Sequence, residues 1–257
     1  MASVSIGSVF YELKNSYRPL FLILIGVTVL QFGLELQPEF FEINLIPHFL
    51  IVLLPLGISI YSFGISRLYG GSKIFGRAYF AFGLAYFATF VAESLYVYFL
   101  DILNQEVPVV ADYFLFSFYP LLLAHLIINI RYFAEKISNF QKITIGTVPV
   151  FLTLGYTLLV FSNPVDDLSY FYYSLIFVIF ATLQLGLVFV GFSLFRQTVL
   201  FSTWLLLLVG IFVGTIGDIA YYYIEILDGS WIGNASSLWI GSNMIILYAL
   251  YKHQKSI

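Results

Sequence analysis

The sequence predicts an all-α integral membrane protein with eight transmembrane helices, built as two parallel four-helix repeats with both termini in the cytoplasm. The first observation behind this prediction is composition. Of 257 residues, 61% are hydrophobic and only 10% charged, and the mean hydropathy is +0.96. Soluble domains are about half apolar and a quarter charged, so a soluble globular protein is excluded. The other two observations are the lengths of the apolar stretches and the placement of the charges.

The first element is a short segment ahead of the first apolar run. Its apolar side chains recur at helical spacing on one face, at Ile6, Val9, Phe10, Leu13 and Tyr17. We expect residues 1–18 to form an amphipathic interfacial helix on the cytoplasmic surface. A signal peptide is disfavoured, because the apolar run starts late and ends without a small-residue cleavage site.

Eight apolar stretches follow, each long enough, or nearly so, to cross a hydrocarbon core of ~30 Å at ~1.5 Å per residue. They are residues 19–37, 44–69, 78–100, 112–132, 143–162, 170–195, 199–225 and 236–251. The connections between them are brief, so nearly the whole chain is predicted to be one bundle embedded in the lipid bilayer.

The charges fall on two sides of this bundle. Every basic residue lies at one set of helix ends, at Lys14, Arg18, Arg67, Lys73, Arg77, Arg131, Lys136, Lys142, Arg196, Lys252 and Lys255. The opposite ends carry acidic residues and no basic one. Because positively charged loops stay in the cytoplasm, the sequence predicts a multi-pass plasma-membrane protein with both termini inside. Charges that merely marked loops would be mixed on each side.

The chain also shows signs of an internal duplication. A shift of 125 residues places the first four spans on the last four, with Glu93 on Asp218 and Tyr96 on Tyr221. The predicted units are a first repeat at 19–132, a second at 143–251 and a cytoplasmic tail at 252–257. Four spans is an even number, so the two repeats share an orientation and are related by an axis along the membrane normal.

Two ionised residues lie in the interior of predicted spans, away from the span ends: Glu93 in the third and Asp218 in the seventh. Each is about 10–12 Å from the outer end of its span by helical rise, where a charge costs several kcal/mol unless it is paired, hydrated or protonated. Helical spacing adds one threonine and one tyrosine to each acid's face: Thr89 and Tyr96, and Thr215 and Tyr221. These stripes predict a polar pocket that opens outward and binds a ligand or a proton. The alternative is that both acids are protonated and hold the halves together by hydrogen bonds.

Small residues lie beside both acids. Gly210 and Gly214 form a Gly-x-x-x-Gly pair on the Asp218 helix, and an alanine stripe runs down a neighbouring face of the Glu93 helix at Ala81, Ala85, Ala88 and Ala92. Such faces allow helices to approach closely.

The sequence predicts no cofactor and no metal site. There is no cysteine, and no two histidines share the spacing of a metal-ligand pair. His125 and His48 stay as possible members of the pocket. Asn129, Gln184 and Asn243 are interpreted as hydrogen-bonding residues between helices. Nucleic acid is excluded as a partner, because the basic residues are few and dispersed.

Part of the first half resembles a known family. The residues are Ala92-Glu-Ser-Leu-Tyr-Val-Tyr, Pro108-Val-Val-Ala-Asp-Tyr-Phe and Tyr119-Pro-Leu-Leu, and the second half repeats an acidic position at Asp218-Ile-Ala-Tyr, followed by Trp239 and Gly241. This pattern resembles the N-terminal membrane input domains of bacterial diguanylate cyclases and sensor kinases. The chain departs from that family at Ala92-Glu93, where the family has Gly-Asp, and it ends about six residues after the last span, without an output domain.

The resemblance implies a non-enzymatic membrane sensor that works through a separate cytoplasmic or membrane protein partner. Three alternatives remain: a structural accessory subunit of a membrane complex, a transporter using the acids as a proton or cation relay, and an intramembrane lipid hydrolase. The last follows from a looser resemblance to lysoplasmalogenase-like hydrolases, in which Glu93, His125 and Asp218 would fill the acidic and histidine positions. No residue is assigned as catalytic.

Overall fold

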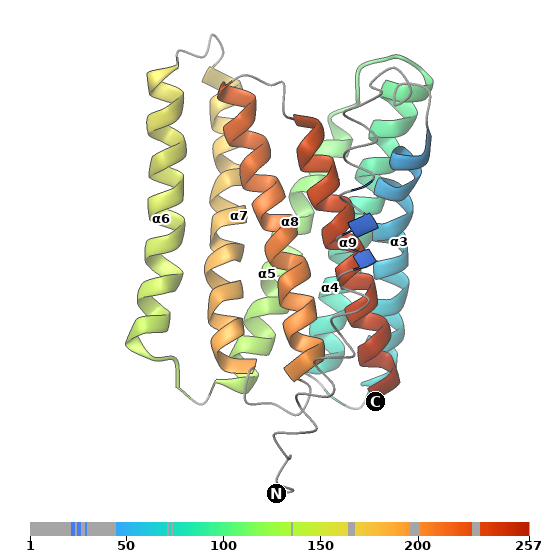
Figure 1. Cartoon of the computed structure of the whole chain (residues 1–257), viewed down its shortest axis with the longest axis vertical. Helices are drawn as coiled ribbons and strands as arrows, with labels where there is room; N and C mark the ends of the chain where they lie inside the picture. Colours follow the sequence, from blue (N-terminus) through green and yellow to red (C-terminus); the bar gives the residue numbers. More distant parts are fainter. Residues whose placement is uncertain are drawn as a thin grey trace, which may run out of the picture.

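The computed structural model describes residues 22–23, 25–26, 29, 45–70, 72, 74–134, 136–163, 168–195, 201–227 and 232–256, and this part of the chain is helical throughout apart from its connections. Its elements are α3 (Leu45–Leu68), α4 (Phe75–Tyr96), the π-helix η1 (Val97–Ile102), α5 (Val110–Phe133), α6 (Asn139–Ser162), α7 (Leu168–Phe195), α8 (Phe201–Leu227) and α9 (Ile232–Ser256). The helices run up and down in an upright bundle (Figure 1).

Each predicted span from the second to the eighth coincides with one of these helices, and the all-α prediction is confirmed. Within the first predicted span, Leu22, Ile25 and Val29 are helical. The rest of that span and the predicted interfacial helix at 1–18 lie outside the described residues.

The predicted tail at 252–257 is described as far as residue 256. Residues 252–256 are the last turn of α9, because two side chains there pack against the bundle. His253 is 1% exposed, with its Nε2 atom 3.1 Å from the Tyr69 hydroxyl. The Lys252 ammonium donates to Ser202 Oγ at 3.1 Å.

Within the described part of the chain, six helical segments are long and apolar enough to cross a membrane: Phe49–Leu68, Phe75–Leu100, Val110–Phe133, Asn139–Ser162, Phe171–Leu194 and Ser202–Ile224. They indicate a multi-pass membrane protein. α9 is equally long but more polar, since it carries Ser237, Ser242 and Asn243. Ser237 and Ser242 are buried, so this helix turns polar side chains into the protein rather than toward lipid.

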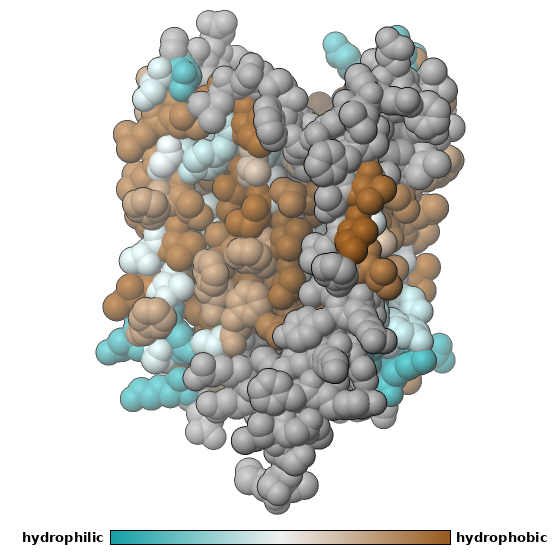
Figure 2. All heavy atoms as spheres, viewed as in Figure 1, coloured by the Kyte–Doolittle hydropathy of each residue, from teal (hydrophilic) through white to brown (hydrophobic). Residues whose placement is uncertain are grey.

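The outer surface is apolar across the middle of the molecule. α6 lies at one edge of the bundle and exposes large side chains along its length, with Phe140 and Phe151 each 78% exposed and Phe161 71% exposed. Figure 2 shows apolar residues over the middle of the visible face and hydrophilic residues toward its ends. This distribution is what a surrounding lipid bilayer requires.

The two ends of the bundle carry different charges. Because consecutive helices run in opposite directions, Arg67, Arg77, Arg131 and Lys142 lie at the same end as the last turn of α9, which we call the basic end. The connection between η1 and α5, with Glu106, lies at the opposite end, which we call the acidic end.

The helices form two groups of three. α4 packs against α3 and α5, and α8 packs against α7 and α9. The groups meet along two seams, α3 against α9 and α5 against α7, while α6 packs mainly on α7. α4 and α8 therefore occupy equivalent places, each in the middle of its own group.

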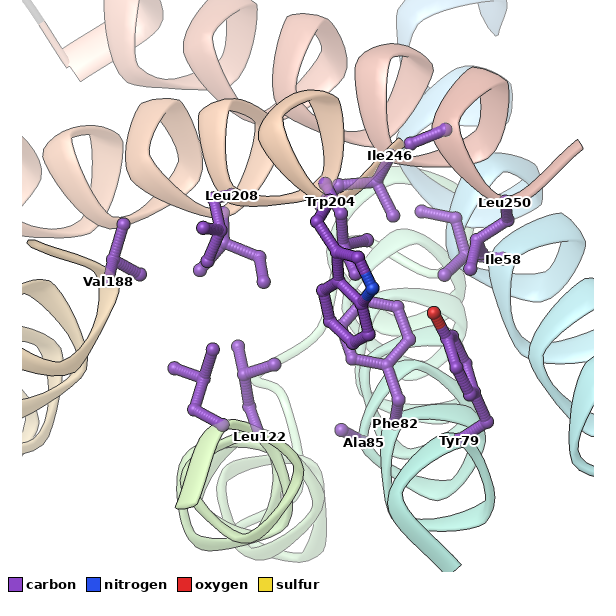
Figure 3. Packing of buried hydrophobic residues seen from close by; sticks show 14 of the residues in the cluster. Ile58, Tyr79, Phe82, Ala85, Leu122, Val188, Trp204, Leu208, Ile246 and Leu250 are labelled. Carbon is purple, nitrogen blue, oxygen red and sulfur yellow. The ribbon is translucent and has the colours of Figure 1, made fainter. Parts of the chain in front are cut away.

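The largest apolar core fills the space between the groups toward the basic end. The Trp204 indole of α8 points toward Phe82 and Tyr79 of α4, while Ile246 and Leu250 close the cluster from α9 (Figure 3). The Trp204 and Tyr79 rings lie 6.1 Å apart between centroids. We call this apolar cluster the Trp204 core. It separates the interior near the acidic end from the basic end.

Candidate functional site

A cavity of about 390 Å³ lies between the two groups of helices, on the acidic-end side of the Trp204 core. Six helices line it, all of the described ones except α6. Both intramembrane acids border it, Glu93 from α4 and Asp218 from α8. Each acid lies nine residues before the end of its continuous helix, Glu93 ahead of Ile102 and Asp218 ahead of Leu227. The structure therefore brings together the two acids that the sequence singled out.

Asp218 is held by side chains from two other helices. Its Oδ1 atom accepts a hydrogen bond of 2.9 Å from Trp239 Nε1 on α9. The Tyr119 hydroxyl of α5 is a second hydrogen-bond partner. Two neutral donors fix the direction of the carboxylate without neutralising its charge, so the group stays available to a positively charged or proton-donating partner.

On the other side of the cavity, Glu93 is not held by its neighbouring tyrosine in the way that Asp218 is held by Trp239 and Tyr119. Thr89 and Tyr96 line the cavity with it, as the stripe predicted. The Tyr96 hydroxyl donates to Asp112 Oδ1 at the start of α5 rather than to Glu93. The helix continues directly from Tyr96 into η1, and π-helical turns within longer helices occur frequently at functional sites.

The second threonine of the predicted stripes has a different position. Thr215 does not border the cavity and is fully buried. Its hydroxyl donates to the Ile211 carbonyl at 2.8 Å and accepts from Gln184 Nε2 of α7 at 2.6 Å. The prediction that Gln184 hydrogen-bonds between helices is confirmed, and Thr215 supports Gln184 rather than the carboxylate.

The Gly-x-x-x-Gly pair brings α8 close to α9, as its spacing predicted. A Cβ atom on Gly214 would lie 2.7 Å from Ser242 Oγ, and one on Gly210 would lie 3.2 Å from the Ser242 carbonyl oxygen. The Ser242 hydroxyl donates to the Gly210 carbonyl at 2.8 Å. This close approach places Trp239 beside Asp218.

Of the two candidate histidines, the structure describes the side chain of His125 only, and it lies outside the cavity. His125 is fully buried in the core, with Nδ1 2.9 Å from the Ala78 carbonyl oxygen and its ring 4.5 Å from that of Phe82. It does not border the cavity that holds Glu93 and Asp218. His48 lies in the first turn of α3, and its side chain is outside the described part of the structure.

Several residues of the site were not singled out as site members in the sequence. Besides Gln184 and Asn243, they include the aromatic side chains Tyr86, Phe118, Tyr119, Tyr173, Tyr222 and Trp239. The contact of Trp239 with Asp218 could have been predicted from the sequence. α8 and α9 form an antiparallel hairpin around residues 228–231, and Asp218 and Trp239 lie at comparable distances before and after it. The sequence holds no such signal for Tyr119, because the contact of its helix with α8 depends on the packing of the two groups.

The lining is acidic and aromatic. Of the described residues that border the cavity, two are carboxylates, eight are aromatic and none is basic. No group of three His, Asp or Glu residues within the described chain could hold a metal ion. A cavity lined by aromatic rings and two carboxylates is suited to an organic guest or a proton.

No protein-family model, curated protein or solved structure matches the chain. The resemblance to membrane input domains therefore stays a prediction. The fold and the cavity define the class of protein: a multi-pass helical membrane protein with a buried acidic cavity.

Proposed function

We propose that the protein is a non-enzymatic membrane sensor that binds a small ligand in the cavity and passes a helix rearrangement to a separate protein partner. The observation that carries this proposal is that Glu93 and Asp218 belong to different helix groups and border one cavity. A guest that contacts both acids changes the balance of forces at the seams between the groups. That is the differential interaction a ligand needs in order to shift a conformational equilibrium.

The proposal includes two repeats and a fixed orientation. The contact pattern supports the duplication, because exchanging α3 with α7, α4 with α8 and α5 with α9 turns the α3–α9 seam into the α7–α5 seam. The sidedness of the charges supports a basic end, with both termini, in the cytoplasm of a cell whose plasma membrane holds the bundle. The cavity then lies nearer the outer side.

Purification in mild detergent from native membranes tests the proposed function. Mass spectrometry of the purified protein identifies both retained small molecules and retained proteins. We expect the wild-type chain to retain a compound that the Glu93→Gln, Asp218→Asn double variant loses, and a signalling protein as partner. Glu106→Gln is the matched control, since Glu106 is an exposed acid in the connection before α5. Its replacement should change neither the retained compound nor the retained partner protein.

Three results would reject the sensor proposal. Retention of the same compounds by the wild-type protein and by the double variant would mean that the carboxylates do not bind them. Unfolding of the double variant, with no compound bound to the wild-type protein, would support acids that hold the halves together. A set of membrane-enzyme subunits in place of a signalling partner would indicate a structural accessory subunit.

A cation-coupled transporter is the second candidate, favoured by the position of both acids at the interface between the two groups. The Trp204 core closes the basic-end side of the cavity in this conformation, so transport requires that core to open. Uptake driven by a proton gradient in proteoliposomes, abolished by Asp218→Asn, would establish this function. A lipid hydrolase using His125 is disfavoured, because His125 does not reach the cavity.

A further inference from the structure

The lining of the cavity identifies the chemical class of its guest. We propose that the cavity binds an organic ammonium ion, a primary or secondary amine attached to an apolar or aromatic group. This inference rests on the proposed ligand-binding function and deepens it. It is carried by three features of the site: the balance of charge, an unused hydrogen-bond acceptor and the aromatic walls.

The charge of the cavity favours a cation. Glu93 and Asp218 border it, and no described lining residue is basic. Charges far from water are costly unless an opposite charge is close. A positively charged guest supplies that charge to both acids, whereas an anion would add a third negative group to the same space.

Gln184 supplies the second feature and requires a donor on the guest. The Thr215 hydroxyl has one hydrogen, which it gives to the Ile211 carbonyl, so toward Gln184 it acts as an acceptor. This fixes the Gln184 amide with its NH₂ group toward Thr215. Its Oε1 atom then has no donor among the described residues; Gln184 borders the cavity, but this oxygen is buried, so a guest reaches it once the side chains around it shift.

A buried carbonyl oxygen without a donor is costly. An N–H group of a primary or secondary ammonium ion provides that donor, and a quaternary ammonium ion does not. Gln184 therefore separates amines that carry N–H groups from fully methylated ones.

Aromatic side chains supply the third feature. Tyr221 and Trp239 flank Asp218, with their ring centroids 5.7 Å apart, while Tyr86 and Tyr222 border the same cavity. The faces of such rings attract cations and also pack against apolar groups. The volume, about 390 Å³, falls within the usual range of ~300–1,000 Å³ for small-molecule sites. A bare metal ion would leave most of this space and these walls unused.

An ammonium group of this kind has two sources at a membrane: a free amine or the headgroup of phosphatidylethanolamine. The experiment separates them by the choice of lipid. The whole chain is placed in nanodiscs of phosphatidylglycerol, which has no amine, and its thermal unfolding is followed as 2-phenylethylamine is added. A second arm replaces part of the phosphatidylglycerol by phosphatidylethanolamine without added amine.

Three close analogues serve as controls in the first arm. 2-Phenylethanol is neutral, 3-phenylpropionate is negatively charged, and the N,N,N-trimethyl derivative keeps the positive charge but has no N–H group. We expect saturable stabilisation by 2-phenylethylamine or by phosphatidylethanolamine, weaker stabilisation by the trimethyl derivative, and none by the alcohol or the carboxylate.

Variants place the binding in this cavity. Asp218→Asn keeps an acceptor for Trp239 and Tyr119 but removes the charge, and it should weaken amine binding by roughly 30-fold or more. Glu93→Gln should act in the same direction. Tyr221→Leu tests the aromatic wall without changing either acid. The Glu106→Gln control should bind as the wild-type protein does.

Two results would overturn the inference. The first is equal or stronger stabilisation by the alcohol or the carboxylate, or none by an amine in either lipid arm. The second is unchanged amine affinity in Asp218→Asn, Glu93→Gln and Tyr221→Leu, which would put the amine elsewhere. The proposed function fails separately, if no compound retained on purification depends on the two acids. A retained neutral or acidic compound would uphold that function and reject the ammonium class.

Discussion

At the scale of single residues, Asp218 depends on a partner from the neighbouring helix. Trp239 Nε1 donates to its Oδ1 atom across the α8–α9 hairpin, and the Trp239 ring lies beside Tyr221. A charge-assisted hydrogen bond in a poorly hydrated site contributes more than one at the surface. The indole thus positions the carboxylate that we propose to face the ammonium group.

Replacement of Trp239 by phenylalanine tests this contact. Trp239→Phe keeps an aromatic ring and removes the N–H donor, so it should lower the free energy of unfolding by about 1–2 kcal/mol. The measurement is denaturant unfolding in detergent. In an Asp218→Leu background, which has no acceptor, the same change should cost much less. Equal costs in the two backgrounds would show that the hydrogen bond contributes nothing.

Gln184 is positioned by Thr215 in the same manner. Thr215→Val keeps the shape of the side chain but removes the oxygen that accepts from Gln184 Nε2. We expect the freed amide to lose its fixed orientation and amine affinity to fall by about 3- to 10-fold, measured by titration in nanodiscs. Thr147→Val is the control, since Thr147 is exposed on α6 and its hydroxyl donates to the Ile143 carbonyl of its own helix. Unchanged affinity in Thr215→Val would remove the positioning role of Thr215.

At the scale of helices, the close contact of α8 with α9 depends on glycine. Added methyl groups at Gly210 and Gly214 would meet Ser242 and Ile246, whereas the equivalent space beside Gly146 of α6 is empty within 4 Å. The two sites share a residue type and differ in their surroundings. They therefore separate the intrinsic cost of glycine in a helix from the benefit of close packing.

Gly210→Ala should destabilise the protein by about 1–3 kcal/mol, because the methyl group overfills the α8–α9 contact. Gly146→Ala should be neutral or stabilise by up to ~1 kcal/mol, since alanine is the better helix former. Thermal unfolding of both variants in the same detergent measures the difference. Similar effects at both positions would contradict the proposed role of the glycine pair in packing.

At the scale of the whole molecule, the basic and acidic ends define an orientation that chemical labelling can test. The chain has no cysteine, so single cysteines report without background. A Cys at Glu106 (E106C) lies in the acidic-end connection, and a Cys at Lys136 (K136C) lies in the basic-end connection; both positions are exposed.

We expect a membrane-impermeant maleimide to label E106C on intact cells and to label K136C only after the membrane is opened. The physical reason is that loops rich in Lys and Arg remain in the cytoplasm. The reverse pattern would invert the orientation, and the cavity would then open nearer the cytoplasm.

The sequence predicted the helices well, because each depends on local information. A run of apolar residues in lipid has to satisfy its own backbone hydrogen bonds and so becomes a helix. The helices found at the second to eighth predicted spans follow from this rule, and six of the described helices are apolar enough to cross a membrane. The ends of the polar helix α9 were the hardest to predict, since its serines and asparagine face the interior and weaken the apolar signal.

The sequence by itself also determined which acids lie within the bundle and which side chains share their helix faces. Only the tertiary structure decided that Glu93 and Asp218 border one cavity, that Thr215 turns toward Gln184, and that His125 belongs to the core. Helical periodicity assigns each residue to a face of its own helix. Which faces meet depends on packing between helices, and that packing brought Glu93 and Asp218, which are 125 residues apart, to one cavity together with Tyr119 and Gln184.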